Sequence, residues 1–299
     1  MPTRREFVQQ SALVGGALAG MSACASSGAP QRSALESAVI PARGAASAIK
    51  QSVCRWCFND MPLDELAANA KRIGLHSVEL IGPPDFPTIK KHGLMCAMVS
   101  QAGTGGIPRG WNRVDNHSWL IPAYEERIAL VAQEKWPNVI CFSGNRAGLG
   151  DDEGLENCAK GLKQLMPAAE KAGVTVCMEL LNSKVNHPDY QCDHTAWGVK
   201  LAEKVGSERF KLLYDIYHMQ IMEGDVIATF KKHKDKICHY HTAGVPGRNE
   251  IGDAQELNYR GIVNALADIG YTGYLAQEFM PKNKDPLASL KEAVAICSV

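Results

Sequence analysis

The chain lacks an excess of charge of either sign, because its 32 Lys and Arg residues balance its 32 Asp and Glu residues. A chain with no net positive field has no general attraction for nucleic acid or for an acidic membrane surface, so we expect neither as a partner. The sequence also lacks a P-loop and a GxGxxG turn after its first strand-like run, which disfavours an open doubly wound nucleotide-binding sheet. A small-molecule partner fits these absences.

A hydrophobic run long enough to span a membrane is also missing from the N-terminus. The apolar stretch over residues 12–21 is too short for a bilayer core of about 30 Å, and it follows Arg4 and Arg5 as in a twin-arginine export signal. We therefore predict a twin-arginine signal peptide over residues 1–25, export to the periplasm, and no membrane span. Cys24 lies in a loose lipobox, which leaves two alternatives: a lipid anchor at Cys24, giving a membrane-anchored lipoprotein, or simple cleavage near Ala25.

Cysteines are present, but their spacing offers little for a metal or redox centre. Cys54 and Cys57 form a CxxC pair with no second pair to complete a zinc site. Several of the ten cysteines, such as Cys96, Cys141 and Cys177, lie within apolar runs, where a reduced thiol behaves as a small hydrophobe. We expect few disulfides or none.

After a predicted disordered linker, residues 26–50, rich in Ala, Ser, Gly and Pro, the sequence alternates short apolar runs with amphipathic segments. The predicted strands are residues 52–58, 77–81, 94–99, 138–142, 174–180, 210–214, 237–241 and 273–278. The predicted helices include residues 62–73, 119–135, 154–172, 196–205, 259–269 and 286–296. Gly74, Gly173, Gly206 and Gly270 follow the ends of four of these helices. This alternation predicts a single-domain (β/α)8 TIM barrel over residues 51–299.

Four of the later strand-like runs end on, or just before, a residue that can bind a metal: Glu179, Asp215, His241 and Glu278. The carboxyl ends of barrel strands meet at one mouth, so we predict that these side chains lie together there. Carboxylate oxygens and an imidazole nitrogen suit Mn2+, Mg2+ or Co2+, and such an ion would leave positions for substrate oxygens. The predicted cofactor is one divalent metal.

The chemistry of such a site is proton transfer next to a carbonyl group. A divalent ion that polarises a carbonyl and holds the adjacent hydroxyl acidifies the C–H bond between them and stabilises the resulting enediolate. Glu179 and Glu278 come from non-adjacent strands and are therefore the candidate catalytic pair, one taking a proton and the other returning it.

Four further residues are candidates for substrate binding. His218 lies three positions after Asp215, and Arg248 follows Pro246 and Gly247 in a loop where its guanidinium could clamp substrate oxygens. His187 lies in the loop after Glu179, and Glu256 follows Arg248 in the same long connection.

Residues near the N-terminal strands have two open interpretations. Glu79 ends the second predicted strand, where it could orient another ligand or serve a buried structural role. Trp56 could form an apolar wall against a sugar or pack in the core.

Two segments of the sequence resemble hydroxypyruvate isomerases. They are residues 210–225, FKLLYDIYHMQIMEGD, and residues 243–250, AGVPGRNE, followed by ELNY at 256–259. The likeness extends over residues 53–296, and the wider family is that of the xylose isomerase-like barrels. The resemblance implies that Glu179, Asp215, His241 and Glu278 occupy the metal positions of the family, and that Glu179 and Glu278 are its proton-transfer pair. His241 stands where hydroxypyruvate isomerases often carry Gln and ketose epimerases carry His, which leaves the substrate open.

The predicted function is therefore a metal-dependent intramolecular isomerase or epimerase of a small hydroxy-carbonyl compound such as hydroxypyruvate or a ketose. A lyase or dehydratase acting on keto-sugars or keto-glycosides uses the same enolisation and is the first alternative. A non-catalytic, metal-bearing sugar-binding protein is the second, although it would need no second proton-transfer carboxylate. Assembly into a homo-oligomer is left open by the sequence.

Overall fold

The computed structural model describes residues 49–298, and the predicted signal peptide and nearly all of the predicted linker lie outside this range. A parallel sheet runs through its centre in the order β2-β1-β7-β6-β5-β4-β3. The strands are β1 (Lys50–Cys54), β2 (Ser77–Glu79), β3 (Asn138–Cys141), β4 (Thr175–Leu180), β5 (Phe210–Asp215), β6 (Ile237–Thr242) and β7 (Tyr274–Gln277).

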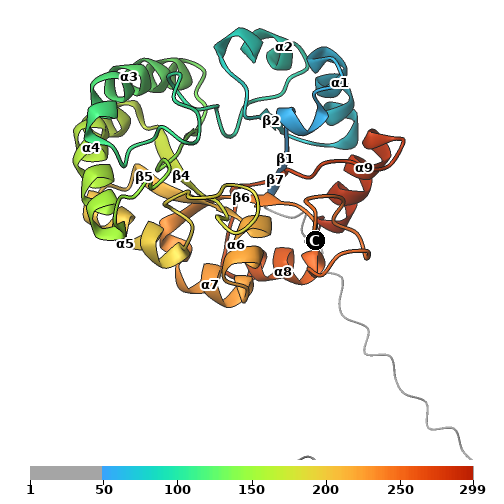
Figure 1. The fold of residues 1–299 in the computed structure, drawn as a ribbon. Coiled ribbons are helices and arrows are strands. Elements are labelled where there is room, and N and C mark those ends of the chain that lie inside the picture. Colours follow the sequence, from blue (N-terminus) through green and yellow to red (C-terminus); the bar gives the residue numbers. More distant parts are fainter. Residues whose placement is uncertain (1–48, 299) are drawn as a thin grey trace, which may run out of the picture. The chain divides into compact units, whose positions relative to one another are not determined.

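Helices surround these strands, as the view in Figure 1 shows. The α-helices are α1 (Leu63–Ile73), α2 (Phe86–Lys91), α3 (His117–Gln133), α4 (Asp151–Ala172), α5 (Thr195–Val205), α6 (Ile216–Met222), α7 (Val226–Lys232), α8 (Tyr259–Asp268) and α9 (Pro286–Ile296). Short 3-10 helices are η1 (Arg55–Phe58), η2 (Pro83–Asp85), η3 (Val114–Asn116) and η4 (Lys234–Lys236). No helix of residues 49–298 is both long and apolar enough to span a bilayer.

The predicted strand over residues 94–99 is the one strand that differs from expectation in kind. Met95 pairs with Ser77 of β2 and Val99 pairs with Val139 of β3, both in parallel, so this segment joins the two edges of the sheet. Between those points the Met98 carbonyl accepts the Leu80 backbone N–H at 2.8 Å. At Ala97 side chains replace the ladder, because the Ala97 N–H donates to Ser77 Oγ at 2.8 Å and Asn138 Nδ2 donates to the Ala97 carbonyl at 2.9 Å. The segment closes the ring as an irregular eighth member, and the predicted TIM barrel is confirmed.

The first strand is shorter than predicted. β1 ends at Cys54, and residues 55–58 form η1. The predicted strand end at Phe58 is therefore wrong, because the chain turns at the barrel mouth. This turn takes Trp56 out of the strand and brings it to the site described below.

Helix ends follow the glycine pattern. Gly74, Gly173 and Gly206 are the C-caps of α1, α4 and α5 in the left-handed region, which a residue with a Cβ adopts at a cost, and Gly270 has a φ of 75° just after α8. Each of these turns reverses the chain from a helix into the next strand. The strands that follow, β2, β4, β5 and β7, are buried apart from one half-buried residue each in β5 and β7, as expected for a parallel sheet covered by helices.

Cysteines within residues 49–298 are free thiols, nine in number. Cys177 Sγ and Cys238 Sγ lie 3.0 Å apart, but their strands, β4 and β6, are separated by β5. Both are free thiols, and their separation is that of a hydrogen bond in which either sulfur can be the donor.

Candidate active site

Four side chains converge at the carboxyl ends of the second half of the barrel. Glu179 lies on β4, Asp215 ends β5, His241 lies on β6 and Glu278 directly follows β7. Asp215 and His241 are direct partners in the parallel ladder, so their side chains point to the same side of the sheet. One ligand atom from each residue lies within 4.8 Å of the others, and all four residues are buried. The structure thus brings together the whole predicted metal group.

His241 is at the centre of this group. Its Nδ1 lies 2.8 Å from Glu278 Oε2 and 3.5 Å from Glu179 Oε1. Its Nε2 points the other way and lies 2.8 Å from Glu79 Oε1. The imidazole therefore lies between the carboxylates of Glu179 and Glu278, which line the cleft, and the fully buried carboxylate of Glu79.

Arg248 covers the group from the loop after β6. Its Nη2 donates to Glu278 Oε2 at 2.7 Å and to Asp215 Oδ2 at 3.3 Å, and its guanidinium lies 5.0 Å from the Trp56 ring centre. Arg248 has a φ of 60°, a conformation that non-glycine residues rarely adopt and that functional sites often retain. The loop thus holds the guanidinium over two of the candidate metal ligands.

His218 and His187 lie beside Arg248. Asp215 caps α6 by accepting the His218 backbone N–H at 3.1 Å, which turns the His218 side chain toward the site. His218 Nδ1 accepts the Asn182 backbone N–H at 3.1 Å, and its Nε2 lies 3.0 Å from Arg248 Nη1. The His187 ring centre is 5.3 Å from that of His218.

Glu256 lies apart from this group. Its carboxylate is exposed and accepts a hydrogen bond from Gln220 Nε2 at 3.2 Å. It does not line the cleft above the site. Its assignment to substrate binding stays a prediction.

Burial and mutual charge separate the pKa values of the carboxyl groups. Burial would raise the pKa of Glu278, but the positive charges of His241 and Arg248 hold it well below the ordinary value. Burial raises the pKa of Glu179, and it raises that of Asp215 well above the usual range in spite of Arg248. The pKa values of the two glutamates are thus shifted in opposite directions, which is the arrangement that acid–base pairs use.

The histidines respond in opposite directions. Burial would lower the pKa of His241, but the Glu278 charge and the neighbouring Cys54 raise it well above 6.5. Burial, followed by the charge of Arg248, lowers the pKa of His218 well below 6.5 and also lowers that of His187. The shifts therefore favour the protonated form of His241 and the neutral form of His218.

The donor set fits a divalent cation. Three carboxylates and one imidazole nitrogen are the ligands that Mn2+, Mg2+ and Co2+ accept. Glu179 Oε1 is buried without a hydrogen-bond partner, a state that is costly unless another group satisfies it. An ion bound by these four residues would supply that partner.

A cleft of about 370 Å³ opens above the site. Its titratable lining residues are Glu179, His187, Arg248 and Glu278, all from the β4–β7 half of the barrel. The remaining lining is mainly apolar and comes largely from the segments around β1 to β3: Trp56, Leu80, Ser100, Gln101, Ile107, Ile140, Phe142 and Leu181. The cleft therefore has one polar half and one apolar half.

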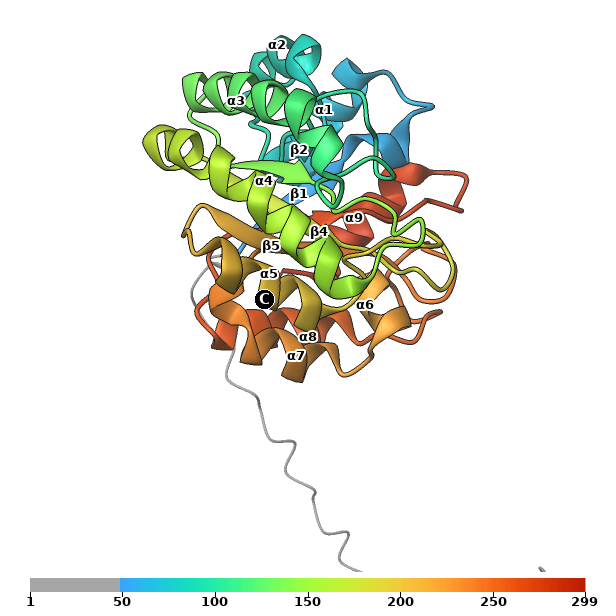
Figure 2. The ribbon, with the colours of Figure 1, turned by 60° about the vertical axis from the view of Figure 1, so that its left-hand side comes forward.

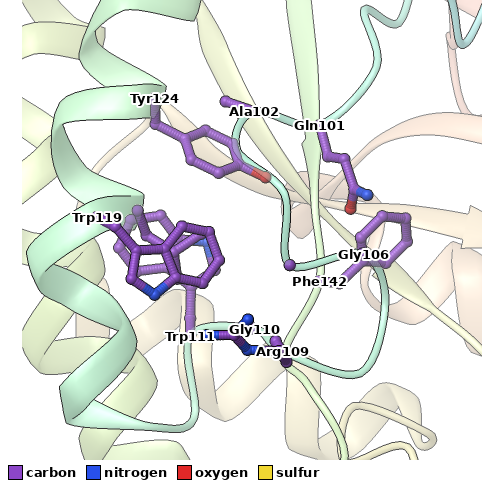
Figure 3. Close-up of a pocket in the computed structure, with 11 residues that line it drawn as sticks. Gln101, Ala102, Gly106, Arg109, Gly110, Trp111, Trp119, Tyr124 and Phe142 are labelled. Atoms are coloured by element: carbon purple, nitrogen blue, oxygen red, sulfur yellow. The ribbon is translucent and has the colours of Figure 1, made fainter.

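Residues 101–111 form part of the apolar wall and are anchored on α3. Figure 3 shows Trp119 and Tyr124 projecting from α3, with Gln101 and Phe142 across the pocket from them. The Arg109 guanidinium lies 5.4 Å from the Trp119 ring centre. Figure 2 shows that long loops gather at the end of the barrel where α6 begins.

The comparisons with known proteins agree with this geometry. The xylose isomerase-like TIM barrel family matches residues 61–297. The chain belongs to the xylose isomerase-like TIM barrel family. The resemblance predicted from the sequence is thereby confirmed.

Relatives of this xylose isomerase-like chain carry isomerase names, in agreement with the predicted enzyme class. A 2-oxo-tetronate isomerase of Haemophilus influenzae is 28% identical over 242 residues, which cover 76% of this chain and 91% of the relative. A hydroxypyruvate isomerase of Escherichia coli is 26% identical over 223 residues, covering 71% of this chain and 86% of the relative. The crystal structure of an AP endonuclease of family 2 from Brucella melitensis has a TM-score of 0.73 and 25% identity, covering 83% and 98% of the two chains.

Two contacts of this xylose isomerase-like barrel go beyond what the sequence predicted. Trp56 Nε1 donates to Glu278 Oε1 at 2.8 Å, a contact that depends on the turn after β1. His239 lies two residues before His241 on β6 and shares Glu79 with it. The spacing of two residues on a strand is a signal for His239, since such residues face the same side. No local sequence pattern predicts that Trp56 contacts Glu278.

Proposed function

We propose that the chain is a divalent-metal-dependent isomerase or epimerase of a small hydroxy-carbonyl compound, with hydroxypyruvate, a related keto acid or a ketose as the substrate class. The observation that carries the proposal is the placement of two buried glutamates around one candidate metal group. β5 and β6 separate the strands that hold Glu179 and Glu278, so the two carboxylates approach a bound substrate from different sides. The isomerase names of relatives that match most of the chain support the same reaction class.

Glu179, Asp215, His241 and Glu278 would hold the ion. When bound, the ion would polarise the substrate carbonyl and stabilise the enediolate that forms when the neighbouring carbon loses its proton. One of the two glutamates takes the proton from one carbon. The other delivers a proton either to the adjacent carbon, in which case the hydroxyl hydrogen also passes to the former carbonyl oxygen, or to the opposite face of the same carbon. The first outcome is isomerisation and the second is epimerisation.

Arg248 binds and orients the substrate in this scheme. Its guanidinium stacks over the Trp56 ring and donates hydrogen bonds to Glu278 and Asp215. Arg248 also lines the cleft. A guanidinium can hold a substrate carboxylate or two neighbouring oxygens bidentately. His218 lies beside Arg248 on the buried side, and its lowered pKa leaves the positive charge of Arg248 as the local attraction for substrate oxygens.

The test is solvent exchange with the purified protein. The protein is loaded with Mn2+, Mg2+ or Co2+ in turn and incubated in D2O with hydroxypyruvate, 2-oxo-tetronate and a panel of ketoses. We expect deuterium at the carbon next to the carbonyl group of the substrate that is turned over, with no change in the substrate's composition. A protein that exchanges no deuterium into any of these compounds with any of the three metals would contradict the proposal.

The apolar half of the cleft favours a second candidate, a lyase or dehydratase of keto-sugars or keto-glycosides. An engineered apolar cavity of about 150 Å³ binds a benzene ring, whereas this cleft measures about 370 Å³. A keto-glycoside could place its reacting ketone at the polar half and its remaining ring against Phe142 and Ile107. The same enolisation would then expel the substituent instead of returning a proton to carbon.

Mass analysis of the products separates the two candidates. Retention of the substrate mass means isomerisation, and loss of water or an aglycone means elimination. Ile107→Ala should lower kcat/KM for a glycoside more than for hydroxypyruvate, because only the larger substrate reaches that wall. Val114→Ala is the matched control, since Val114 is exposed, lies in the same connection and does not line the cleft.

We also propose that the protein works in the periplasm after twin-arginine export. The paired arginines and the short apolar run of the N-terminus support this proposal. Fractionation of cells that produce the full chain, with an Arg4→Lys, Arg5→Lys variant as control, tests it. Equal periplasmic amounts of both forms would contradict it.

A further inference from the structure

A fourth carboxylate lies directly below the candidate metal group. Glu79 ends β2 and is fully buried. Its Oε1 accepts hydrogen bonds from His241 Nε2 at 2.8 Å and from His239 Nε2 at 2.9 Å. The Cys54 thiol also donates to Oε1, at 3.8 Å, and Oε2 is buried without a hydrogen-bond partner.

The barrel brings these groups together across its interior. β2 and β6 are not neighbours, because β1 and β7 separate them in the sheet. His239 and His241 alternate with Tyr240 along β6 and therefore point to the same side. Inward-pointing side chains from different strands stack in layers within a barrel, and the layer of Glu79 lies beneath that of the candidate ligands.

The two nitrogens of His241 have different surroundings. Nε2 faces Glu79, which can only accept a hydrogen from it, and Nδ1 faces Glu278 and Glu179. An imidazole that keeps its hydrogen on Nε2 presents a lone pair on Nδ1. Metal-bound histidines commonly donate their second N–H to a carboxylate, which fixes the tautomer and the ring orientation.

We propose that Glu79 is a positioning residue for the metal site: it accepts the Nε2–H of His241 and so aims the Nδ1 lone pair at the ion held with Glu179, Asp215 and Glu278. The proposal rests on the metal dependence proposed above. Glu79 touches neither the ion nor the substrate in this arrangement. It acts on metal affinity through the orientation of one ligand.

Binding of Mn2+ to the metal-free full-length protein, measured by calorimetry, tests the proposal without any activity assay. Glu79→Gln keeps the size of the side chain but loses the charge and presents a mixed donor–acceptor amide. We expect its Mn2+ affinity to fall about 10–100-fold, the usual effect of removing such a partner of a ligand. Glu208→Gln is the matched control, because it makes the same substitution at an exposed carboxylate paired with Lys211; its affinity should stay within about threefold of wild type.

The outcomes distinguish a positioning role from a structural one. A Glu79→Gln variant that unfolds at a lower temperature but binds Mn2+ as tightly as wild type would overturn the proposal. Wild-type protein that binds none of Mn2+, Mg2+ or Co2+ would refute the metal dependence itself, and the role of Glu79 would fall with it.

A measurement on the wild-type chain keeps the proposal testable if Glu79→Gln does not fold. In 15N NMR of the Mg2+-loaded protein, His241 should show a hydrogen on Nε2 and none on Nδ1. The signal is assigned by its loss in His241→Asn. A hydrogen on Nδ1 in the loaded protein would exclude Nδ1 as the ligand and overturn the assignment.

Discussion

Glu278→Gln is the substitution with the clearest consequence. Three groups contact this side chain: His241 Nδ1 at 2.8 Å, Arg248 Nη2 at 2.7 Å and Trp56 Nε1 at 2.8 Å. Glutamine is nearly isosteric and keeps one oxygen for these donors, but it cannot take up or deliver a proton. It also removes the main negative charge that keeps His241 protonated in the metal-free site.

The expected loss of turnover is about 10²–10⁴-fold, which is the usual contribution of a general acid or base and corresponds to about 2.7–5.4 kcal/mol in the barrier. Loss of the buried charge next to Arg248 also destabilises the metal-free protein, because removal of one member of a buried ion pair costs about 3–5 kcal/mol and the retained amide oxygen offsets part of it. We therefore expect a lower Tm in the metal-free state as well.

The assay is turnover and deuterium exchange with the substrate identified for the wild type, at saturating metal. Glu208→Gln is the control, since Glu208 is an exposed carboxylate paired with Lys211 and precedes the start of β5, at the opposite end of that strand from Asp215. We expect Glu208→Gln to match the wild type in both assays. Turnover by Glu278→Gln within a few-fold of wild type, with metal bound, would refute the role of Glu278 in proton transfer.

Three further predictions concern the surroundings of the site. Arg248→Ala should raise KM more than it lowers kcat, because the guanidinium binds substrate oxygens and takes no part in proton transfer; an unchanged KM would contradict this role. Mn2+ affinity should rise by up to about tenfold per pH unit while His241 is protonated in the free protein, because the raised pKa of His241 means that the ion must displace a proton. Calorimetry in two buffers of different ionisation enthalpy measures this proton release. No proton release at pH 7 would show that His241 is already neutral. Trp56→Phe keeps an aromatic face under Arg248 but removes the hydrogen bond to Glu278. A hydrogen bond to a charged group contributes about 1.5–3 kcal/mol, so the Tm should fall by about 3–10 °C. A Tm equal to that of wild type would mean that this hydrogen bond does not stabilise the fold.

Much of the fold follows from local sequence signals. The barrel was predicted from apolar runs that end at a polar residue, from helices that end at glycine and from the even spacing of these elements. Helix α9 has the predicted bounds. The segment over residues 94–99 could not be resolved in this way. Its apolar pattern is that of a strand, but the side chains of Ser77 and Asn138, 20 and 41 residues away, take the backbone hydrogen bonds of Ala97.

The candidate site divides along the same line. The ends of β4, β5, β6 and β7 each carry one polar residue, and parallel strands in a barrel present their carboxyl ends at one mouth, so the sequence alone predicted that Glu179, Asp215, His241 and Glu278 meet. His218 was placed by the same local reasoning, since Asp215 caps the helix that begins after it.

The sequence by itself determined the barrel and the four residues at its mouth, because the ends of strands and helices depend on residues that are neighbours along the chain. Only the tertiary structure decided that Trp56 reaches Glu278, that Arg248 covers the site and that Glu79 supports His241 from below. These contacts join segments separated by 222, 30 and 162 residues. The physical reason is that a hydrogen bond across a barrel depends on the closure and register of the whole sheet, which no local pattern of residues specifies.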